Sequence, residues 1–214
     1  IDARRTSLER PLLVHVANAA PQKNHLAILD AFEIVRRSYP NAELAFAGVI
    51  DRRSDLGRNI LARAASSGMA SSIRFLGPLG RRDLSHLLSR AHIALLPSIF
   101  EGFSIASLEY TYFGLPTVLS PTGAAQWLAE KYKHVVLAAH SALSPDELSA
   151  DAIHLRSAAP APEVIESIAD AVIHILGEYE LYSALALEAG RDWAAYSIEA
   201  TGRNYLDVVK AVAV

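Results

Sequence analysis

Residues 93–109 read IALLPSIFEGFSIASLE, and this stretch decides the fold. Its first four residues form a short apolar run, which predicts a buried strand. A loop containing Gly102 follows, and a helix is expected from Ser104 onward. A strand, a glycine loop and a helix start, in this order, present free backbone N–H groups and a positive dipole end to an anion. The stretch therefore predicts an anion site at the carboxyl edge of a parallel sheet.

Two carboxylates, Glu101 and Glu109, lie on either side of this loop and helix start. Glu101 is in the loop, and Glu109 lies about two turns into the helix. Carboxylates repel an anion, so they are better suited to accept hydrogen bonds from hydroxyl groups. A ligand that carries both a diphosphate and many hydroxyls is a nucleotide sugar.

Outward from this stretch, short apolar runs alternate with segments of helical periodicity, joined by short loops. This alternation predicts an α/β fold, a Rossmann-like parallel sheet with helices on both faces and further helices at the C-terminal end. Strands are expected at residues 11–16, 43–47, 73–76, 93–96, 117–119 and 135–137. Helices are expected at 24–38, 55–67, 82–89, 104–113, 124–130, 163–176, 178–193 and 197–212, the last capped by Ser197. Residues 138–162 are expected to form a loop with one short helical piece near 145–153.

The expected organisation has three parts. Residues 1–10 are a polar linker, 11–176 a Rossmann-like nucleotide-sugar-binding domain, and 177–214 a helical tail that packs on the same domain. The chain starts at Ile1 and not at a methionine, so we expect a fragment of a longer protein.

Composition excludes several classes of function. A formal net charge of −3, without a basic stripe, gives no field for nucleic acid. There is no cysteine, so thiolate chemistry is absent, and the chain is consistent with a reducing, cytoplasmic compartment. The eight histidines lack metal-ligand spacing, and no Asp-x-Asp occurs, which argues against a manganese-dependent donor site. No Gly-x-Gly-x-x-Gly follows the first strand, which weakens a nicotinamide dehydrogenase interpretation.

Residues 101–109 resemble the E-x7-E signature of retaining glycosyltransferases with the GT-B fold (group 1, similar to family 4). In that family the signature lies in the C-terminal, donor-binding domain. Other segments resemble family elements in the same order, from about Pro11 to Val136, with a vaguer helical similarity to the end. They are residues 14–18 (VHVAN) with 21–25 (PQKNH), residues 73–77 (IRFLG), and residues 116–120 (PTVLS).

The resemblance implies a role for each site residue. Lys23 and Glu101 would be the catalytic residues, with Lys23 at the donor's diphosphate and Glu101 beside the transferred sugar. Glu109 would accept hydrogen bonds from both ribose hydroxyls. Backbone N–H groups at the helix start would meet phosphate or sugar oxygens, and a second glycine would open a loop near the phosphates. These further donor-binding residues are Gly102, Phe103, Ser104, Ile105 and Gly123.

The chain departs from the family pattern at three places. Asn18 stands where an arginine usually meets the diphosphate, so it would bind the donor without a charge. Residues 123–127 read GAAQW where the family often has Gly-Gly-x-Pro-Glu, and residues 110–113 (YTYF) are bulkier than usual.

The resemblance thus implies a hexosyltransferase-type glycosyltransferase domain that takes a sugar from a nucleotide-diphosphate donor, with retention and without a metal or other cofactor. A carbohydrate or lipid-linked acceptor would bind a missing N-terminal domain, so this chain alone would be inactive. Polysaccharide biosynthesis is a common setting for such proteins, and peripheral membrane association through the absent half is compatible with it. Two alternatives remain open: a degenerate, non-catalytic binding module, and a nucleotide-sugar epimerase or phosphorylase relative.

Overall fold

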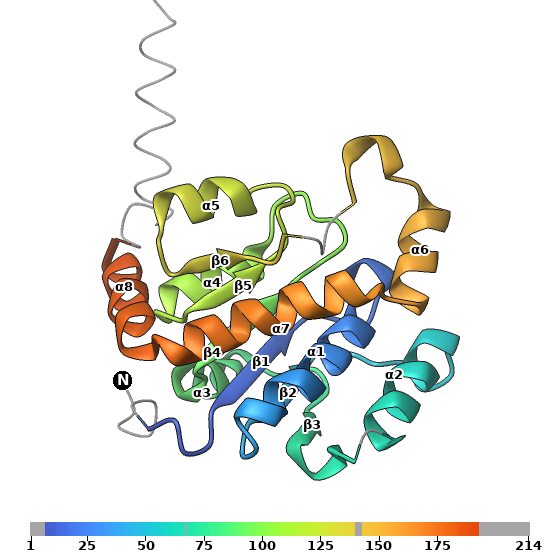
Figure 1. Cartoon of the computed structure of the whole chain (residues 1–214), viewed down its shortest axis with the longest axis horizontal. Helices are drawn as coiled ribbons and strands as arrows, with labels where there is room; N and C mark the ends of the chain where they lie inside the picture. Colours follow the sequence, from blue (N-terminus) through green and yellow to red (C-terminus); the bar gives the residue numbers. More distant parts are fainter. Residues whose placement is uncertain (1–6, 67, 140–142, 193–214) are drawn as a thin grey trace, which may run out of the picture.

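The computed structural model describes residues 7–66, 68–139 and 143–192. Six parallel strands form one sheet in the order β3-β2-β1-β4-β5-β6 (Figure 1). The order reverses direction between β1 and β4, which are neighbours in the sheet although far apart in the sequence. The strands are β1 (Leu12–Val16), β2 (Glu43–Ala47), β3 (Ile73–Phe75), β4 (Ile93–Leu96), β5 (Thr117–Leu119) and β6 (Val135–Leu137). The expected Rossmann-like sheet is confirmed.

Helices connect these strands and continue beyond the last one (Figure 1). The α-helices are α1 (His25–Ser38), α2 (Asp55–Ser66), α3 (Arg81–Arg90), α4 (Ile105–Tyr112), α5 (Ala125–Lys131), α6 (Ala150–Ala158), α7 (Pro162–Gly177) and α8 (Tyr179–Arg191). Short 3-10 turns are η2 (Pro21–Lys23), η3 (Ala70–Ser72) and η4 (Pro145–Glu147).

The sheet is covered on both faces because successive strand residues point to opposite sides. Leu13 and Leu95 belong to the core that α1, α2 and α7 cover. Val14 and Leu96 belong to the core on the other side, against α3, α4, α5 and α8. Strands with both faces buried need continuous apolar runs, which is what these segments have.

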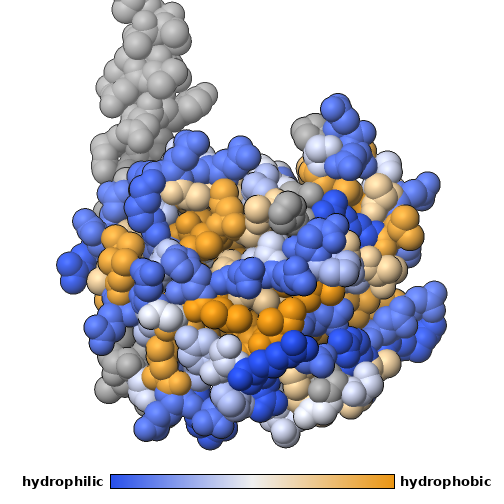
Figure 2. Space-filling view, in the orientation of Figure 1, coloured by the Kyte–Doolittle hydropathy of each residue, from blue (hydrophilic) through white to orange (hydrophobic). Residues whose placement is uncertain are grey.

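Helix α7 shows how the pattern of apolar residues fixes packing. Val164, Ile168 and Val172 are buried against α1, at a spacing that keeps them on one side of the helix. Glu163, Glu166 and other charged residues face outward, and Figure 2 shows hydrophilic residues along this helix with apolar residues beside it.

The structure differs from the expected elements mainly after residue 138. In place of one short helical piece near 145–153 there are two, η4 and α6, and α6 continues to Ala158. Ser149 explains where α6 starts, because its side chain accepts a hydrogen bond from the Ala152 N–H at 3.1 Å. The tail is described only as far as α8, where Ala189 packs into the core; the helix expected at 197–212 and its Ser197 cap lie outside the described residues.

A buried histidine makes the stability of this fold depend on pH. His134 lies just before β6 with no exposed surface, and burial lowers its pKa from 6.5 to about 4. The folded chain therefore holds this imidazole neutral over a range in which the unfolded chain protonates it. Its contribution to stability is present above pH 6.5 and is lost as the pH falls toward 4.

We predict that His134→Leu reduces the acid sensitivity of the fold. Between pH 7.5 and pH 5 the wild type should lose about 2 kcal/mol more unfolding free energy than the variant, since the variant has no imidazole to protonate at that position. Urea unfolding at the two pH values measures this. The Thr111 hydroxyl lies 3.4 Å from Nε2 of His134. It keeps a partner in the variant, because it also donates to the Ser107 carbonyl at 3.1 Å. An equal loss in both proteins would contradict the prediction.

Candidate functional site

The site lies at the carboxyl edge of the sheet, where the loops after β1, β4 and β5 meet. Two hydrogen bonds tie the first two loops together. The Ile99 N–H donates to the Gln22 carbonyl at 2.8 Å, and the Asn24 side-chain amide donates to the Pro97 carbonyl at 3.1 Å. Asn24 has a φ of 57° and caps α1, so the turn that positions Lys23 is fixed on the loop after β4.

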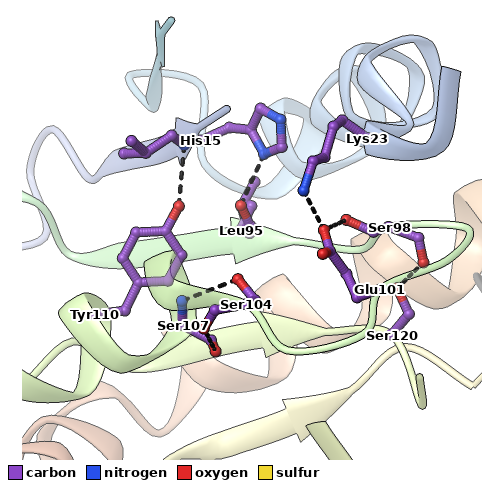
Figure 3. Close-up of polar contacts among 10 residues, drawn as sticks. His15, Lys23, Leu95, Ser98, Glu101, Ser104, Ser107, Tyr110 and Ser120 are labelled. Carbon is purple, nitrogen blue, oxygen red and sulfur yellow. Dashed lines mark hydrogen bonds and ion pairs between the residues drawn. The ribbon is translucent and has the colours of Figure 1, made fainter. Parts of the chain in front are cut away.

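Lys23 and Glu101 form an ion pair across these two loops (Figure 3). Lys23 ends η2, and its Nζ donates to Oε1 of Glu101. The same carboxylate oxygen accepts a hydrogen bond from the Ser98 hydroxyl at 2.9 Å. Ser120, which follows β5, donates in turn to the Ser98 carbonyl. All three loops therefore contribute to the position of one carboxylate.

Helix α4 begins directly beside this cluster. Ser104 is its N-cap: the side chain accepts from the Ser107 N–H at 3.2 Å, and the Ser107 hydroxyl donates back to the Ser104 carbonyl at 2.7 Å. No described residue accepts a hydrogen bond from the N–H groups of Gly102 or Phe103. The helix start therefore keeps backbone donors available, beside a lysine, at the positive end of the helix dipole.

Gly123 lies against the loop that contains Glu101. It has a φ of 53°, and a Cβ atom at this position would lie 2.0 Å from the Gly102 carbonyl oxygen. The Ala124 N–H donates to that same carbonyl at 3.2 Å. A small cavity of about 10 Å³ lies between the two loops, lined by both polar and apolar residues, among them Glu101, Ser120 and Leu96. Gly123 thus allows close contact between the loops after β4 and β5.

Glu109 lies on α4, half-buried, and apart from the Lys23 cluster. No described side chain forms a hydrogen bond or ion pair with its carboxylate. The next residue, Tyr110, is fully buried, and its hydroxyl oxygen accepts from the Val16 N–H at 3.0 Å (Figure 3). Burial raises the pKa of Tyr110, so the phenol stays protonated. Tyr110 therefore anchors α4 to β1 while Glu109 remains available to a ligand.

Asn18 has a structural partner. Its Oδ1 accepts a hydrogen bond from the Val49 N–H at 2.9 Å, which joins the loops after β1 and β2. Gly48 makes the close approach of these loops possible, because a Cβ there would lie 2.1 Å from the Ala17 carbonyl oxygen. Oδ1 of Asn18 is therefore occupied by a contact within the protein, and its NH2 group remains to donate a hydrogen bond to a ligand.

Two exposed apolar side chains lie around the helix start. Phe103 is 59% and Ile105 71% exposed, so their side chains do not hold the loop in place. The role expected of their backbone amides stays a prediction. Trp127 is 44% exposed, with the Lys131 ammonium 5.6 Å from its ring centroid.

Two buried histidines lie behind Lys23. His15 and His25 have ring centroids 4.6 Å apart, and Nδ1 of His15 donates to the Leu95 carbonyl at 2.8 Å (Figure 3). Burial lowers the pKa of His15 to about 4 and that of His25 well below its usual value, with the Lys23 charge adding to both shifts. Both rings are neutral at neutral pH, so Lys23 supplies the positive charge here.

The sequence interpretation missed Ser98, Ser120, Tyr110 and the two histidines as parts of the site. Ser98 carried a local signal, because it lies only three residues before Glu101 in the same loop. The others take part through the pairing of strands far apart in sequence. Among the described residues, no group of three metal-ligating side chains could hold a metal ion. No described helix has the length and apolar character needed to cross a membrane.

The fold and the position of these side chains define a Rossmann-like domain of the class that binds ligands where the strand order reverses. The family described as "Glycosyl transferases group 1" matches residues 2–163, so the chain belongs to that family. The solved structures compared below are GT-B glycosyltransferases. They agree with the interpretation of this chain as a C-terminal domain.

Curated relatives match about half of the chain. An uncharacterized glycosyltransferase, YqgM, of Bacillus subtilis (strain 168) is 30% identical over 117 residues, which are 55% of this chain and 32% of that protein. Glycogen synthase of Mycobacterium tuberculosis (strain H37Rv) is 31% identical over 121 residues, 56% of this chain and 28% of the enzyme. The matched part thus spans about a third of these relatives' length.

Solved structures share the fold at lower identity. Anabaena Alr3699/HepE, in complex with UDP-glucose, has a TM-score of 0.71 at 14% identity, over 99% of this chain and 54% of that one. The C-terminal domain of a glycosyl transferase group 1 protein (LpcC) from Francisella tularensis has a TM-score of 0.61 at 16% identity, over 91% and 92%. The second comparison pairs this chain with a C-terminal domain over nearly all of both.

We predict that Gly123→Ala destabilises the chain and distorts the loop after β4. The new Cβ would overlap the Gly102 carbonyl, and the positive φ adds strain of about 1–2 kcal/mol. Gly77→Ala is the matched control, because Gly77 has a φ of 67° and a Cβ there would meet nothing within 4 Å. Urea unfolding should show a larger loss for Gly123→Ala than for Gly77→Ala. Equal losses would mean that the contact between the two loops is not required.

Proposed function

We propose that this chain is the donor-binding half of a glycosyltransferase that moves a sugar from a nucleotide-diphosphate donor to an acceptor, with retention of anomeric configuration. The observation that carries the proposal is the meeting of Lys23, Glu101 and the open N-terminus of α4 at the edge of the sheet. The retaining outcome follows from the E-x7-E resemblance and not from this geometry.

Each part of a nucleotide sugar has a suitable group at this edge. The diphosphate would meet Lys23 and the backbone N–H groups of Gly102 and Phe103, which also stabilise the charge that develops as the nucleotide leaves. Glu101 would accept hydrogen bonds from sugar hydroxyls. The carboxylate of Glu109 would hold the ribose, since its two oxygens can accept from two neighbouring hydroxyls. The donor would bind without a metal, with the diphosphate charge opposed by the helix dipole and by Lys23 once the phosphates replace Glu101 at its ammonium group.

The acceptor would bind a further domain. The match covers only about a third of the length of each curated relative. We therefore assign acceptor binding and full activity to the rest of a longer, cytoplasmic protein. The relatives and structures compared include a glycogen synthase and a UDP-glucose complex, so the donor's base and sugar are left to experiment.

A non-catalytic binding module is the second candidate, and Asn18 is the observation that favours it. Its Oδ1 is bonded to the Val49 N–H, and it brings no charge to the diphosphate. Such a module would still bind a nucleotide, but the full-length protein would not transfer a sugar.

We predict that the chain binds one of UDP, GDP or ADP saturably, and that Lys23→Ala and Glu109→Gln each weaken this binding about tenfold or more. Lys23→Ala removes the cation for the phosphates. Glu109→Gln removes a charge-assisted hydrogen bond to the ribose. Calorimetric titration with each nucleotide and its sugar conjugates measures the affinities.

Matched controls are Lys133→Ala and Glu188→Gln, which change exposed residues away from this edge. Both should bind like the wild type. Two results would contradict the proposal: a folded chain that binds none of these nucleotides, or Lys23→Ala and Glu109→Gln variants that bind as tightly as the wild type.

A further inference from the structure

The ion pair between Lys23 and Glu101 is a constrained contact and not a pair of solvated surface charges. The side chains are 23% and 17% exposed. Oε1 of Glu101 accepts from both Lys23 and the Ser98 hydroxyl, and Ser120 holds Ser98 from the next loop (Figure 3). The carboxylate is therefore directed at the ammonium group by a network that spans three loops.

This pair neutralises the positive charge that a diphosphate needs. Lys23 contributes one positive charge and Glu101 one negative charge at a shared contact. Asn18 is neutral, and the buried rings of His15 and His25 are neutral at pH 7. A diphosphate that approaches Lys23 would therefore meet the repulsion of Glu101, at a distance where two like charges interact strongly.

We propose that Glu101 is an internal competitor of the diphosphate for Lys23, and that this competition makes the site prefer a nucleotide sugar to the free nucleoside diphosphate. When the phosphates take over the ammonium group, Glu101 loses its cation. A sugar with free hydroxyls can then donate hydrogen bonds to that carboxylate, whereas a bare nucleoside diphosphate leaves it facing a phosphate. This inference rests on the proposed function and adds a mechanism of discrimination to it.

The same competition favours release of the product. Once the sugar has left, no sugar hydroxyl donates to Glu101, and the carboxylate is again free to pair with Lys23. Its return displaces the diphosphate from the lysine. The neutral Asn18 strengthens this effect. A second cation at that position would hold the diphosphate even after Glu101 had paired with Lys23 again.

Glu101→Gln tests the inference, because it removes the charge and keeps the shape and a carbonyl oxygen that Lys23 and Ser98 can use. Calorimetric titrations with UDP, GDP and ADP, and with UDP-glucose, GDP-mannose and ADP-glucose, compare this variant with the wild type and with the control Glu188→Gln. We expect the nucleoside diphosphate that the wild type binds to bind about tenfold tighter in Glu101→Gln. Its sugar conjugate should gain less affinity or lose affinity. The dissociation constant of the nucleoside diphosphate divided by that of its sugar conjugate should therefore fall in Glu101→Gln.

The outcomes separate this inference from the proposed function. If the wild type binds a nucleotide but Glu101→Gln changes both ligands by the same factor, the competition is absent and the proposed function stands. If the variant binds both ligands more weakly, Glu101 supports the site and does not compete, which also overturns the inference. Binding of none of the six ligands by folded wild type and variant overturns both proposals.

Discussion

The parallel pairing of β1 with β4 is the constraint on which the rest of the site depends. These two central strands are joined by backbone register at Leu13 with Ile93 and Val14 with Ala94. The helices that follow them, α1 and α4, lie on opposite faces of the sheet, and the loops that lead to these helices meet at the carboxyl edge. Tyr110 adds a cross-link from α4 to the end of β1. Lys23 and Glu101 can meet only because this arrangement is fixed.

The proposed site uses few charged groups. One lysine, one helix N-terminus and two carboxylates serve a ligand with two phosphates and several hydroxyls, and the nearby histidines stay neutral because they are buried. Most of the polar contacts among Ser98, Glu101 and Ser120 fix positions within the protein. The groups left for a ligand include the Gly102 and Phe103 amides, the Asn18 NH2 group and the Glu109 carboxylate.

Local pattern in the sequence was enough to predict the sheet and most helices. The apolar run at residues 93–96, the glycine loop and the start of α4 at Ser104 or Ile105 all follow from neighbouring residues, and the structure agrees with them. The contacts that could not be predicted join distant residues. Lys23 and Glu101 are 78 positions apart, and Val16 and Tyr110 are 94 apart, so their contacts require the strand order as well as the strands. The Asn18 contact with Val49 was hidden for the same reason.

We propose that a nucleoside diphosphate binds at the start of α4 beside Lys23. An NMR titration of ¹⁵N-labelled chain with the preferred nucleotide tests it most directly, because amide shifts report weak binding residue by residue. We expect saturable shifts at Lys23, Gly102–Ile105 and Gly123. Shifts gathered instead at the groove on the opposite edge of the sheet, lined by Arg10, Arg74 and Arg90, would contradict it.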